Sequence, residues 1–162
     1  MSKAVLSIGA NLGDRLAALQ AAMERFRPWL RAVSPVYETA PWGPVPQEDY
    51  LNAVLVVADE TAAPHTWLER AQAAEQAAGR TRELRWGPRT LDVDIVDVDG
   101  VSSLEPALIL PHPRAAERAF VLVPWLAADP AARLGGVPVA ELVAALPAAE
   151  RDGVRLTGWS LR

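Results

Sequence analysis

The run from Tyr50 to Val57 is the strongest strand signal in the sequence, because every residue in it except Asn52 is apolar. A side-chain amide on such a strand must be hydrogen-bonded if it is buried. The Asn52 amide is therefore hydrogen-bonded either to a nearby turn or to a bound ligand. The sequence of the run leaves both alternatives open. The segments on either side of this strand decide the fold.

Strand and helix patterns alternate on both sides of this run. Pro35 interrupts a strand pattern, which places that strand at a sheet edge or a bulge. Apolar residues recur at helical spacing after a cap near Asp14, and again from Pro64 to a glycine stop at Gly79. Strands are expected over residues 4–8, 32–37, 50–57 and 92–95. The order strand, helix, strand, strand, helix, strand predicts an α+β fold with a ferredoxin-like βαββαβ core, an antiparallel sheet with helices on one face.

The chain beyond residue 95 adds shorter elements to this core. Asp99-Gly100 is a hairpin signal, so residues 101–103 are expected to run back antiparallel. Helical spacing continues over residues 114–126 until Pro124 bends or ends the helix. After this helix, the sequence predicts a last helix over residues 139–146 and a short strand over residues 154–159. No repeat or linker interrupts the chain, so residues 1–162 are interpreted as a single domain.

The composition excludes several classes of protein. The chain has no cysteine and two histidines, which excludes a disulfide framework, a thiolate metal site and a zinc cluster. Its formal net charge of -4 lacks the basic balance of a general nucleic-acid binder. The apolar run at residues 4–8 is too short for a signal segment, and no later run approaches membrane-spanning length. We therefore expect a cytoplasmic monomer with no membrane or nucleic-acid partner.

Residues 80–94 carry four arginines and three carboxylates, a local net charge of +1 within an acidic chain. Gly87-Pro88 indicates irregular backbone, whereas residues 91–95 alternate with the period of a strand. The arginines are therefore expected on a loop. Asp92 and Asp94 are expected on one face of a strand, with backbones about 6.6 Å apart.

Two neighbouring carboxylates favour a divalent cation between them. Magnesium is commonly held by one or two carboxylates together with substrate phosphates. Arginine side chains would bind the phosphate oxygens that the metal leaves uncovered. The pattern therefore indicates phosphoryl transfer on a nucleotide. The alternative is a solvated strand face whose charges happen to alternate.

The glycines of residues 9–13 suggest a phosphate-binding loop only superficially. The segment lacks the Lys-Ser/Thr pair of a Walker A loop, and its glycine spacing is not that of a dinucleotide fingerprint. We interpret it as a structural turn into the first helix.

Five short motifs occur in a characteristic order along the chain. They are Ser-Ile-Gly-Ala-Asn-Leu-Gly-Asp at residues 7–14, Val-Ser-Pro-Val-Tyr-Glu-Thr-Ala-Pro at 33–41, Asp-Tyr-Leu-Asn at 49–52, Arg-Trp-Gly-Pro-Arg-Thr-Leu-Asp-Val-Asp-Ile at 85–95 and Leu-Pro-His-Pro at 110–113. Over residues 4–130 the chain resembles the 6-hydroxymethyl-7,8-dihydropterin pyrophosphokinase family, and the arginine block is the most specific part of the match. The resemblance implies transfer of pyrophosphate from ATP to the pterin alcohol, with AMP as the other product, in folate biosynthesis.

The resemblance also implies roles for individual residues. Asp92 and Asp94 would hold two Mg²⁺ ions between ATP and the pterin hydroxyl, and Arg80 and Arg89 would steady the triphosphate during catalysis. The other ATP-binding residues would be Glu75, Arg82, Arg85, Trp86, His112 and Arg118. The pterin-binding residues would be Thr39, Ala40, Trp42, Tyr50, Asn52 and Phe120. Taken singly, each charged residue could instead be a solvated surface group, and each aromatic residue part of the core.

Two residues depart from the family pattern. Glu83 stands where another basic residue is expected in the catalytic loop, and Pro113 follows His112 where an aromatic residue is possible. The acidic pair and the main arginines remain, so we expect activity to be retained.

Two other functions compete with this interpretation. A different Asp-x-Asp nucleotide transferase would share the metal pair, but its products would differ. A ferredoxin-like RNA-binding module would also use basic loops and stacking aromatic residues. The aspartates at 92 and 94 argue against the RNA-binding module, because they would repel RNA phosphates.

Overall fold

The computed structural model describes residues 2–41, 43–79 and 90–161. At its centre lies an antiparallel six-stranded sheet with the order β10-β3-β4-β1-β5, in which β2 also pairs with β4. The strands of the sheet are β1 (Ser2–Ala10), β2 (Leu30–Val33), β3 (Tyr37–Thr39), β4 (Tyr50–Asp59), β5 (Asp92–Val98) and β10 (Arg155–Leu156). Pro35 lies in the break between β2 and β3, as its strand-breaking chemistry requires. The predicted antiparallel sheet is confirmed.

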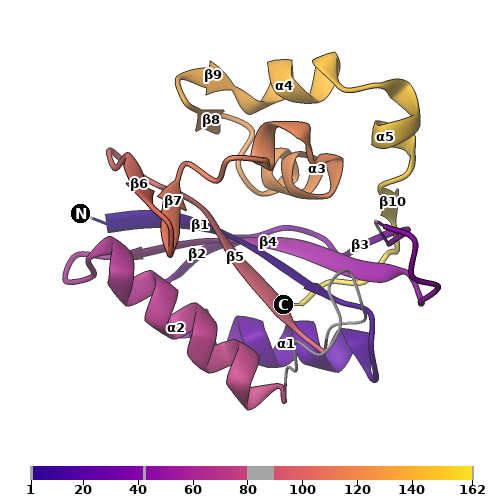
Figure 1. Ribbon diagram of the computed structural model, residues 1–162, viewed down its shortest axis with the longest axis horizontal. Helices are drawn as coiled ribbons and strands as arrows, with labels where there is room; N and C mark the ends of the chain where they lie inside the picture. Colours follow the sequence, from indigo (N-terminus) through magenta and orange to yellow (C-terminus); the bar gives the residue numbers. More distant parts are fainter. Residues whose placement is uncertain (1, 42, 80–89, 162) are drawn as a thin grey trace.

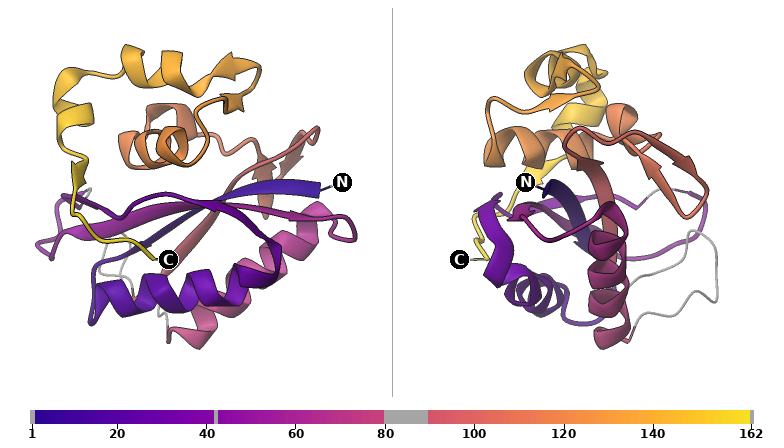
Figure 2. Two further views of the ribbon diagram at one scale, coloured as in Figure 1. Left: turned by 180° about the vertical axis from the view of Figure 1, so that it is seen from behind. Right: turned by 90° about the vertical axis from the view of Figure 1, so that its left-hand side faces the viewer.

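Helices cover both faces of this sheet, so the prediction of helices on one face is wrong (Figure 1). α1 (Arg15–Phe26) and α2 (Pro64–Ala77) lie on one face, and α3 (Ala119–Ala128) lies on the other, with α4 (Val139–Ala145) and α5 (Ala148–Asp152) beyond it (Figure 2). The shorter elements are the 3-10 helices η1 (Arg27–Trp29) and η2 (Ala115–Glu117), and the strand pairs β6 (Ser103–Glu105) with β7 (Leu108–Leu110) and β8 (Arg133–Leu134) with β9 (Val137–Pro138). Within the described ranges, none of the helices combines the length and apolarity needed to cross a lipid bilayer.

The ends of α1 and α2 follow local signals in the sequence. The Asp14 side chain accepts a hydrogen bond from the backbone N–H of Ala17 at 3.1 Å and so caps α1. Pro64 occupies the first turn of α2, where its missing N–H has no helical partner to lose. Gly79 follows α2 with a φ of 72°, a conformation that glycine adopts without strain. Both helices therefore begin where the sequence predicts, and α2 also ends just before the predicted glycine stop.

The sheet separates two hydrophobic cores. Leu6 and Ile8 of β1 pack on the side of α1 and α2, where Trp67 is also fully buried. Val5 of β1 packs on the opposite side with Val54 of β4 and the apolar face of α3. Successive residues of a strand point to opposite faces of its sheet. β4 must therefore be apolar on both faces, which explains why its run is apolar at every position except Asn52.

The hairpin predicted after Asp99-Gly100 is wrong. A turn is present, with Gly100 at a φ of 73°, but residues 101–103 do not return along β5. Ser103 instead begins β6, which pairs with β7. The outer edge of β5 is already hydrogen-bonded to other segments, because the backbone N–H of Val93 donates to a side chain from α2 and the carbonyl oxygen of Val96 accepts from the backbone N–H of His112. A returning strand therefore has no free edge to pair with.

Two predictions for the C-terminal part also need correction. Of the two alternatives for Pro124, ending the helix is excluded, because α3 continues to Ala128, and the helix begins at Ala119 and not at the predicted residue 114. Pro124 and Trp125 are buried, and their packing offsets the backbone hydrogen bond that proline cannot make. The helix predicted over residues 139–146 is present as α4 but is not the last, because α5 follows it. α5 has no buried residue, so its sequence carries little apolar signal.

Leu55→Ala should destabilise the fold strongly, because Leu55 lies in the middle of β4 with no exposed surface. Truncating a fully buried leucine costs about 2–5 kcal/mol of unfolding free energy. Leu104→Ala is the matched control, since that side chain is 92% exposed on β6. Chemical denaturation of both variants measures the difference, and equal losses would contradict the assigned core.

Candidate active site

One lateral row of the sheet brings four of the sequence motifs together. The strand register pairs Asp92 of β5 with Gly9 of β1, Gly9 with Asn52 of β4, and Asn52 with Tyr37 of β3. Residues that pair across antiparallel strands point to the same face of the sheet. Asp92 and Asn52 therefore share one face, with the backbone of β1 between them and roughly 10 Å separating their own backbones.

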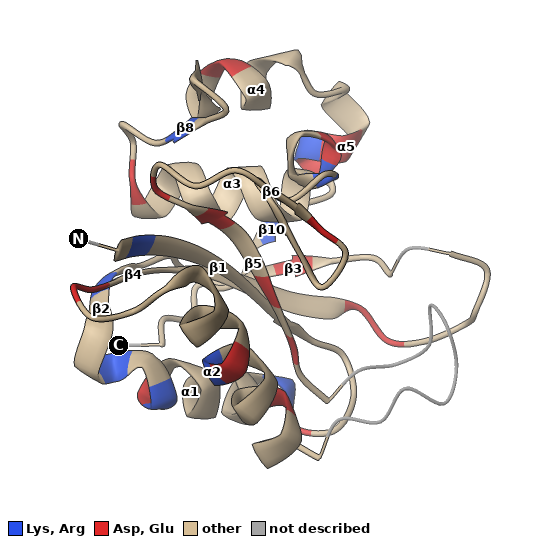
Figure 3. Cartoon of the chain, turned by 60° about the vertical axis from the view of Figure 1, so that its left-hand side comes forward, with Lys and Arg blue, Asp and Glu red and all other residues tan. Residues whose placement is uncertain are grey.

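The next row extends this face toward α3. It pairs Asp94 with Ser7, and Ser7 with Val54. Val54 and Val96 belong to the core beneath α3, so the face changes from apolar to acidic along β5. Figure 3 shows the acidic residues distributed along this strand. The carboxylates thus lie at the end of the α3-side face, next to its apolar core.

Gly9 keeps the centre of this row open. A Cβ added at Gly9 would lie 3.0 Å from Asn52 Oδ1 and 3.4 Å from Tyr50 Cδ1. The absence of a side chain therefore lets the Asn52 and Tyr50 side chains approach the backbone of β1. Gly9 lies within β1, so the structural turn predicted over residues 9–13 is wrong at its start, and the chain leaves the strand only after Ala10.

Asn52 and Thr39 form a buried polar pair beside this opening. The Asn52 side chain is 3% exposed, and its Nδ2 donates to Thr39 Oγ1 at 2.7 Å. The partner is a side chain on the neighbouring strand, not the turn that the sequence left open as an alternative. Thr39 in turn pairs across the sheet with Tyr50. Three residues that the family resemblance assigns to the pterin therefore meet at one place.

Arg118 lies against the acidic pair from the start of α3. Its Nη1 is 3.9 Å from Asp94 Oδ2, an ion-pair distance that is too long for a hydrogen bond. Its guanidinium carbon lies 5.5 Å from the ring centroid of Phe120, within cation–π range. The Arg118 side chain is 18% exposed, so its charge is only partly screened by solvent. The start of α3 therefore places one cation and one aromatic ring near the carboxylates of β5.

His112 is neutral at physiological pH for electrostatic reasons. Burial lowers the pKa of His112 below its usual value of 6.5, and the charges of Arg118 and Arg114 lower it further, while Asp92 opposes them. Its Nδ1 accepts the backbone N–H of Arg114 at 3.1 Å. A neutral imidazole whose Nδ1 is an acceptor carries its proton on Nε2. His112 therefore offers a single Nε2–H donor.

Glu75 approaches the acidic strand from α2, on the other side of the sheet. It is 8% exposed, and its Oε2 accepts the backbone N–H of Val93 at 3.0 Å. Val93 lies between the two aspartates, so this contact helps to fix the backbone that carries both of them. The role of Glu75 in ATP binding stays a prediction.

Several of the predicted residues lie outside the described part of the chain. They are Trp42, Arg80, Arg82, Arg85, Trp86 and Arg89. Ala40 is described and exposed, immediately after β3. The described residues thus supply the acidic pair, His112 and Arg118 near one end of the sheet, and the polar pair of Asn52 and Thr39 two strands away.

The donor set of the acidic pair fits magnesium. Among the described residues, no group of three or more histidine, aspartate and glutamate side chains is placed to hold a metal ion by itself. Asp92 and Asp94 supply hard carboxylate oxygens from one strand face. Magnesium is typically bound by one or two carboxylates and completes its octahedron with water and substrate phosphates. A site with few protein ligands is therefore chemically adequate for this metal.

Comparison with known proteins decides the family. The family model described as 7,8-dihydro-6-hydroxymethylpterin-pyrophosphokinase (HPPK) matches residues 5–130. The chain belongs to the HPPK family. It is similar to the 2-amino-4-hydroxy-6-hydroxymethyldihydropteridine pyrophosphokinase of Mycobacterium tuberculosis, with 49% identity over 96% of this chain and 90% of that protein. The enzyme of the same name from Pseudomonas aeruginosa is 40% identical over 91% of this chain and 93% of that protein.

Solved structures support the fold alone. A crystal structure of wild-type Plasmodium falciparum HPPK-DHPS with SDX-DHP superposes with a TM-score of 0.65 at 14% identity, over 87% of this chain. The chain spans 43% of that longer protein. A mixed α/β fold with an antiparallel sheet is therefore shared with HPPK structures.

Two residues of this candidate site have no functional role predicted from the sequence. Gly9 was interpreted as part of a turn, and Ser7 was given no role, yet both lie on β1 between the acidic and the amide-bearing strands. Ser7 is 5% exposed and pairs directly with Asp94. Both belong to the motif at residues 7–14, but only the strand register shows that they lie between Asp92, Asp94 and Asn52.

The pKa of His112 should be below 6.5 in the free protein, and Arg118→Gln should raise it by removing a neighbouring positive charge. The unfolded chain then binds this proton more readily than the folded chain. The contribution of His112 to unfolding free energy therefore falls as the pH drops below about 6.5. NMR titration of the two histidines measures the pKa, with His112→Gln to assign the signal. Arg133→Gln is the control, and an equal effect from it would contradict the proposed cause.

Proposed function

We propose that this chain performs the HPPK reaction with Asp92 and Asp94 as its metal ligands and with the face around Asn52 as its pterin subsite. The family reaction is the transfer of pyrophosphate to 6-hydroxymethyl-7,8-dihydropterin in folate biosynthesis. ATP would supply the pyrophosphate and leave as AMP. The observation that carries the proposal is the lateral row in which Asp92, Gly9 and Asn52 share one face of the sheet.

The acidic pair would bind two Mg²⁺ ions together with the phosphates of ATP. Bound at this position, the ions would neutralise phosphate charge and stabilise both the attacking and the leaving oxygens of an in-line displacement. Asp92 and Asp94 would supply the oxygens that hold them, and the contact from Glu75 to the Val93 backbone would keep the two carboxylates in place. The Arg118 charge, 3.9 Å from Asp94, would meet phosphate oxygens once ATP is bound.

The pterin would lie over the opening above Gly9. Asn52 can donate and accept hydrogen bonds together, which suits the mixed edge of a pterin, and Thr39 holds the amide in orientation. Tyr50 and Phe120 would stack on the ring, a contact worth about 1–3 kcal/mol for nucleobases. Ala40 and Trp42 would contact the pterin through their backbone. The hydroxymethyl group would then point along the row toward Asp92.

On the ATP side, His112 would donate its Nε2–H to a phosphate oxygen. A neutral donor suits this role, because it retains its proton position across the physiological pH range. Arg80 and Arg89 would steady the triphosphate during transfer, with Arg82, Arg85 and Trp86 as further ATP contacts. These residues are assigned from the family motif, and the assignment stays a prediction.

We also infer that the core is of the ferredoxin-like type. The neighbour order β5-β1-β4-β2 and the chain order of the first two helices support this inference. A monomeric state and a cytoplasmic location stay predictions from the sequence.

Incubation with ATP, Mg²⁺ and 6-hydroxymethyl-7,8-dihydropterin should yield AMP and the pterin diphosphate in equal amounts. Asp94→Asn should lower kcat by about 10²–10³-fold, because it removes a carboxylate that would hold the metal ions whose charge stabilises the transition state. Chromatographic identification of both products, followed by steady-state kinetics, tests these expectations.

Asp97→Asn is the matched control for Asp94→Asn. Asp97 lies on the same strand, and burial, with a smaller contribution from Asp99, raises the pKa of its carboxyl, so a neutral amide is tolerated there. Turnover should be unchanged in this variant. Formation of ADP instead of AMP would contradict pyrophosphate transfer. Full activity of Asp94→Asn would contradict the assignment of Asp94 as a metal ligand.

Gly9→Ala should weaken pterin binding, because the added methyl group would crowd Asn52 Oδ1 at 3.0 Å. Overpacking of this kind costs about 1–3 kcal/mol, so we expect the KM for the pterin to rise roughly tenfold. The KM for ATP should change little. In the Asn52→Ala background the crowded atom is absent, and Gly9→Ala should then have almost no further effect. Additive losses in the double variant would refute this explanation.

A further inference from the structure

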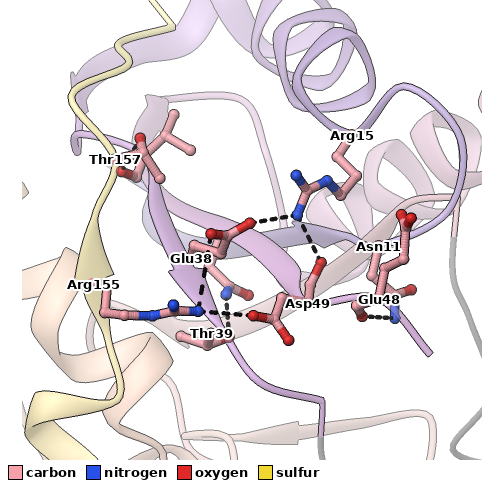
Figure 4. A network of polar contacts seen from close by, with 10 residues as sticks. Asn11, Arg15, Glu38, Thr39, Glu48, Asp49, Arg155 and Thr157 are labelled. Carbon is pink, nitrogen blue, oxygen red and sulfur yellow. Dashed lines mark hydrogen bonds and ion pairs between the residues drawn. The ribbon is translucent and has the colours of Figure 1, made fainter. Parts of the chain in front are cut away.

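The two ends of the segment 40–49 are anchored by charged side chains from distant parts of the chain (Figure 4). This segment joins β3 to β4, and the strand pair at its base is Thr39 with Tyr50. Glu38 precedes Thr39, and Asp49 precedes Tyr50. Whatever holds Glu38 and Asp49 therefore also positions the two pterin-subsite residues that follow them.

Arg15 of α1 provides the first anchor. Its Nη1 donates to Glu38 Oε2 at 2.7 Å and to the backbone carbonyl oxygen of Asp49 at 2.9 Å. Asn11 adds a neighbouring contact, because its Nδ2 donates to the backbone carbonyl oxygen of Glu48 at 2.9 Å. The first turn after β1 is thus tied to both ends of the segment.

Arg155 of β10 provides the second anchor from the other end of the chain. Its Nη2 donates to Asp49 Oδ2 at 2.8 Å and lies 3.9 Å from Glu38 Oε1. Two arginines therefore each contact both Glu38 and Asp49, and the four side chains form a charge-balanced network. Charges in such a network support one another more than an isolated exposed ion pair does.

The backbone around Arg155 is itself held in place. β10 pairs with β3, so that Arg155 lies opposite Glu38. Thr157 donates from its backbone N–H and its Oγ1 to the carbonyl oxygen of Val36, and the carbonyl oxygen of Trp159 accepts from the N–H of Val36. Leu161 is buried in the core on the side of α1 and α2. Arg155 is therefore presented from a fixed strand and not from a free terminus.

We propose that Arg155 is a positioning residue for the pterin subsite. Arg155 and Arg15 both bind Glu38 and Asp49. Through these two residues, Arg155 fixes Thr39 and Tyr50 at the base of the segment 40–49. Arg155 lies outside residues 5–130, the part of the chain that the family model matches. This inference rests on the proposed function in one respect, the assignment of Thr39 and Tyr50 to the pterin.

Arg155→Ala tests the proposal through the two Michaelis constants. The KM for the pterin should rise about three- to fivefold, the scale expected for one partly exposed charged contact, while kcat and the KM for ATP stay within about twofold. Arg155→Lys keeps the charge and should recover part of the loss. Titration calorimetry with the pterin, in the presence of α,β-methylene-ATP and Mg²⁺, should show the same weakening without turnover.

Arg133→Ala is the control, because Arg133 is an exposed arginine of β8 whose Nη2 donates to the carbonyl oxygen of Gly136. It should leave both Michaelis constants unchanged. An unchanged pterin KM in Arg155→Ala, or equal changes in both Michaelis constants, would overturn the positioning role.

Hydrogen exchange separates this inference from the proposed function. Amide exchange at Thr39 and Tyr50 should be faster in Arg155→Ala than in Arg133→Ala, whether or not the pterin is the substrate. If the wild-type protein makes no pterin diphosphate, the proposed function fails, and the exchange rates still decide whether Arg155 holds the base of this segment. Identical exchange in the two variants would overturn the inference even if the enzyme is active.

Discussion

The common register of β5, β1 and β4 is the constraint on which the site depends. Antiparallel pairing places Asp92, Gly9 and Asn52 in one row, and a shift of one residue would turn a strand's side chains to the opposite face. The shift is resisted because the same strands bury apolar residues on both sides of the sheet. The hydrophobic cores therefore hold the catalytic geometry, although no core residue is expected to touch a substrate.

The two faces of the sheet are used differently. The side of α1 and α2 is apolar along β1 and β4, whereas the side of α3 changes from apolar to polar toward the start of β5. The desolvation free energy of Asp92 and Asp94 is lower than that of fully buried charges, because both residues are partly exposed and Arg118 lies near Asp94. Burial lowers the pKa of His112, and the same cation lowers it further. One arginine thus influences both the acidic pair and the nearby donor.

Most elements of the fold could be predicted because their signals are local. The Asp14 cap and the Pro64 start depend on hydrogen bonding and dihedral preferences within one helical turn. Pairing partners are not local, and the hairpin after Gly100 was mispredicted because β6 pairs with β7 and edge groups of β5 are bonded to α2 and to the His112 backbone. Of the alternatives that Pro124 bends or ends its helix, the second is excluded, because burial of α3 outweighs one lost hydrogen bond.

For the site, the sequence by itself determined the pair of carboxylates, since alternation on a strand puts residues i and i+2 on one face. It also determined the family, through motifs whose order no local rule explains. Only the tertiary structure decided that Gly9 separates Asp92 from Asn52, and that Arg155 reaches Asp49 from more than 100 positions along the chain. The physical reason is that register and long-range ion pairs arise from packing between distant segments, which the periodicity of any one segment does not encode.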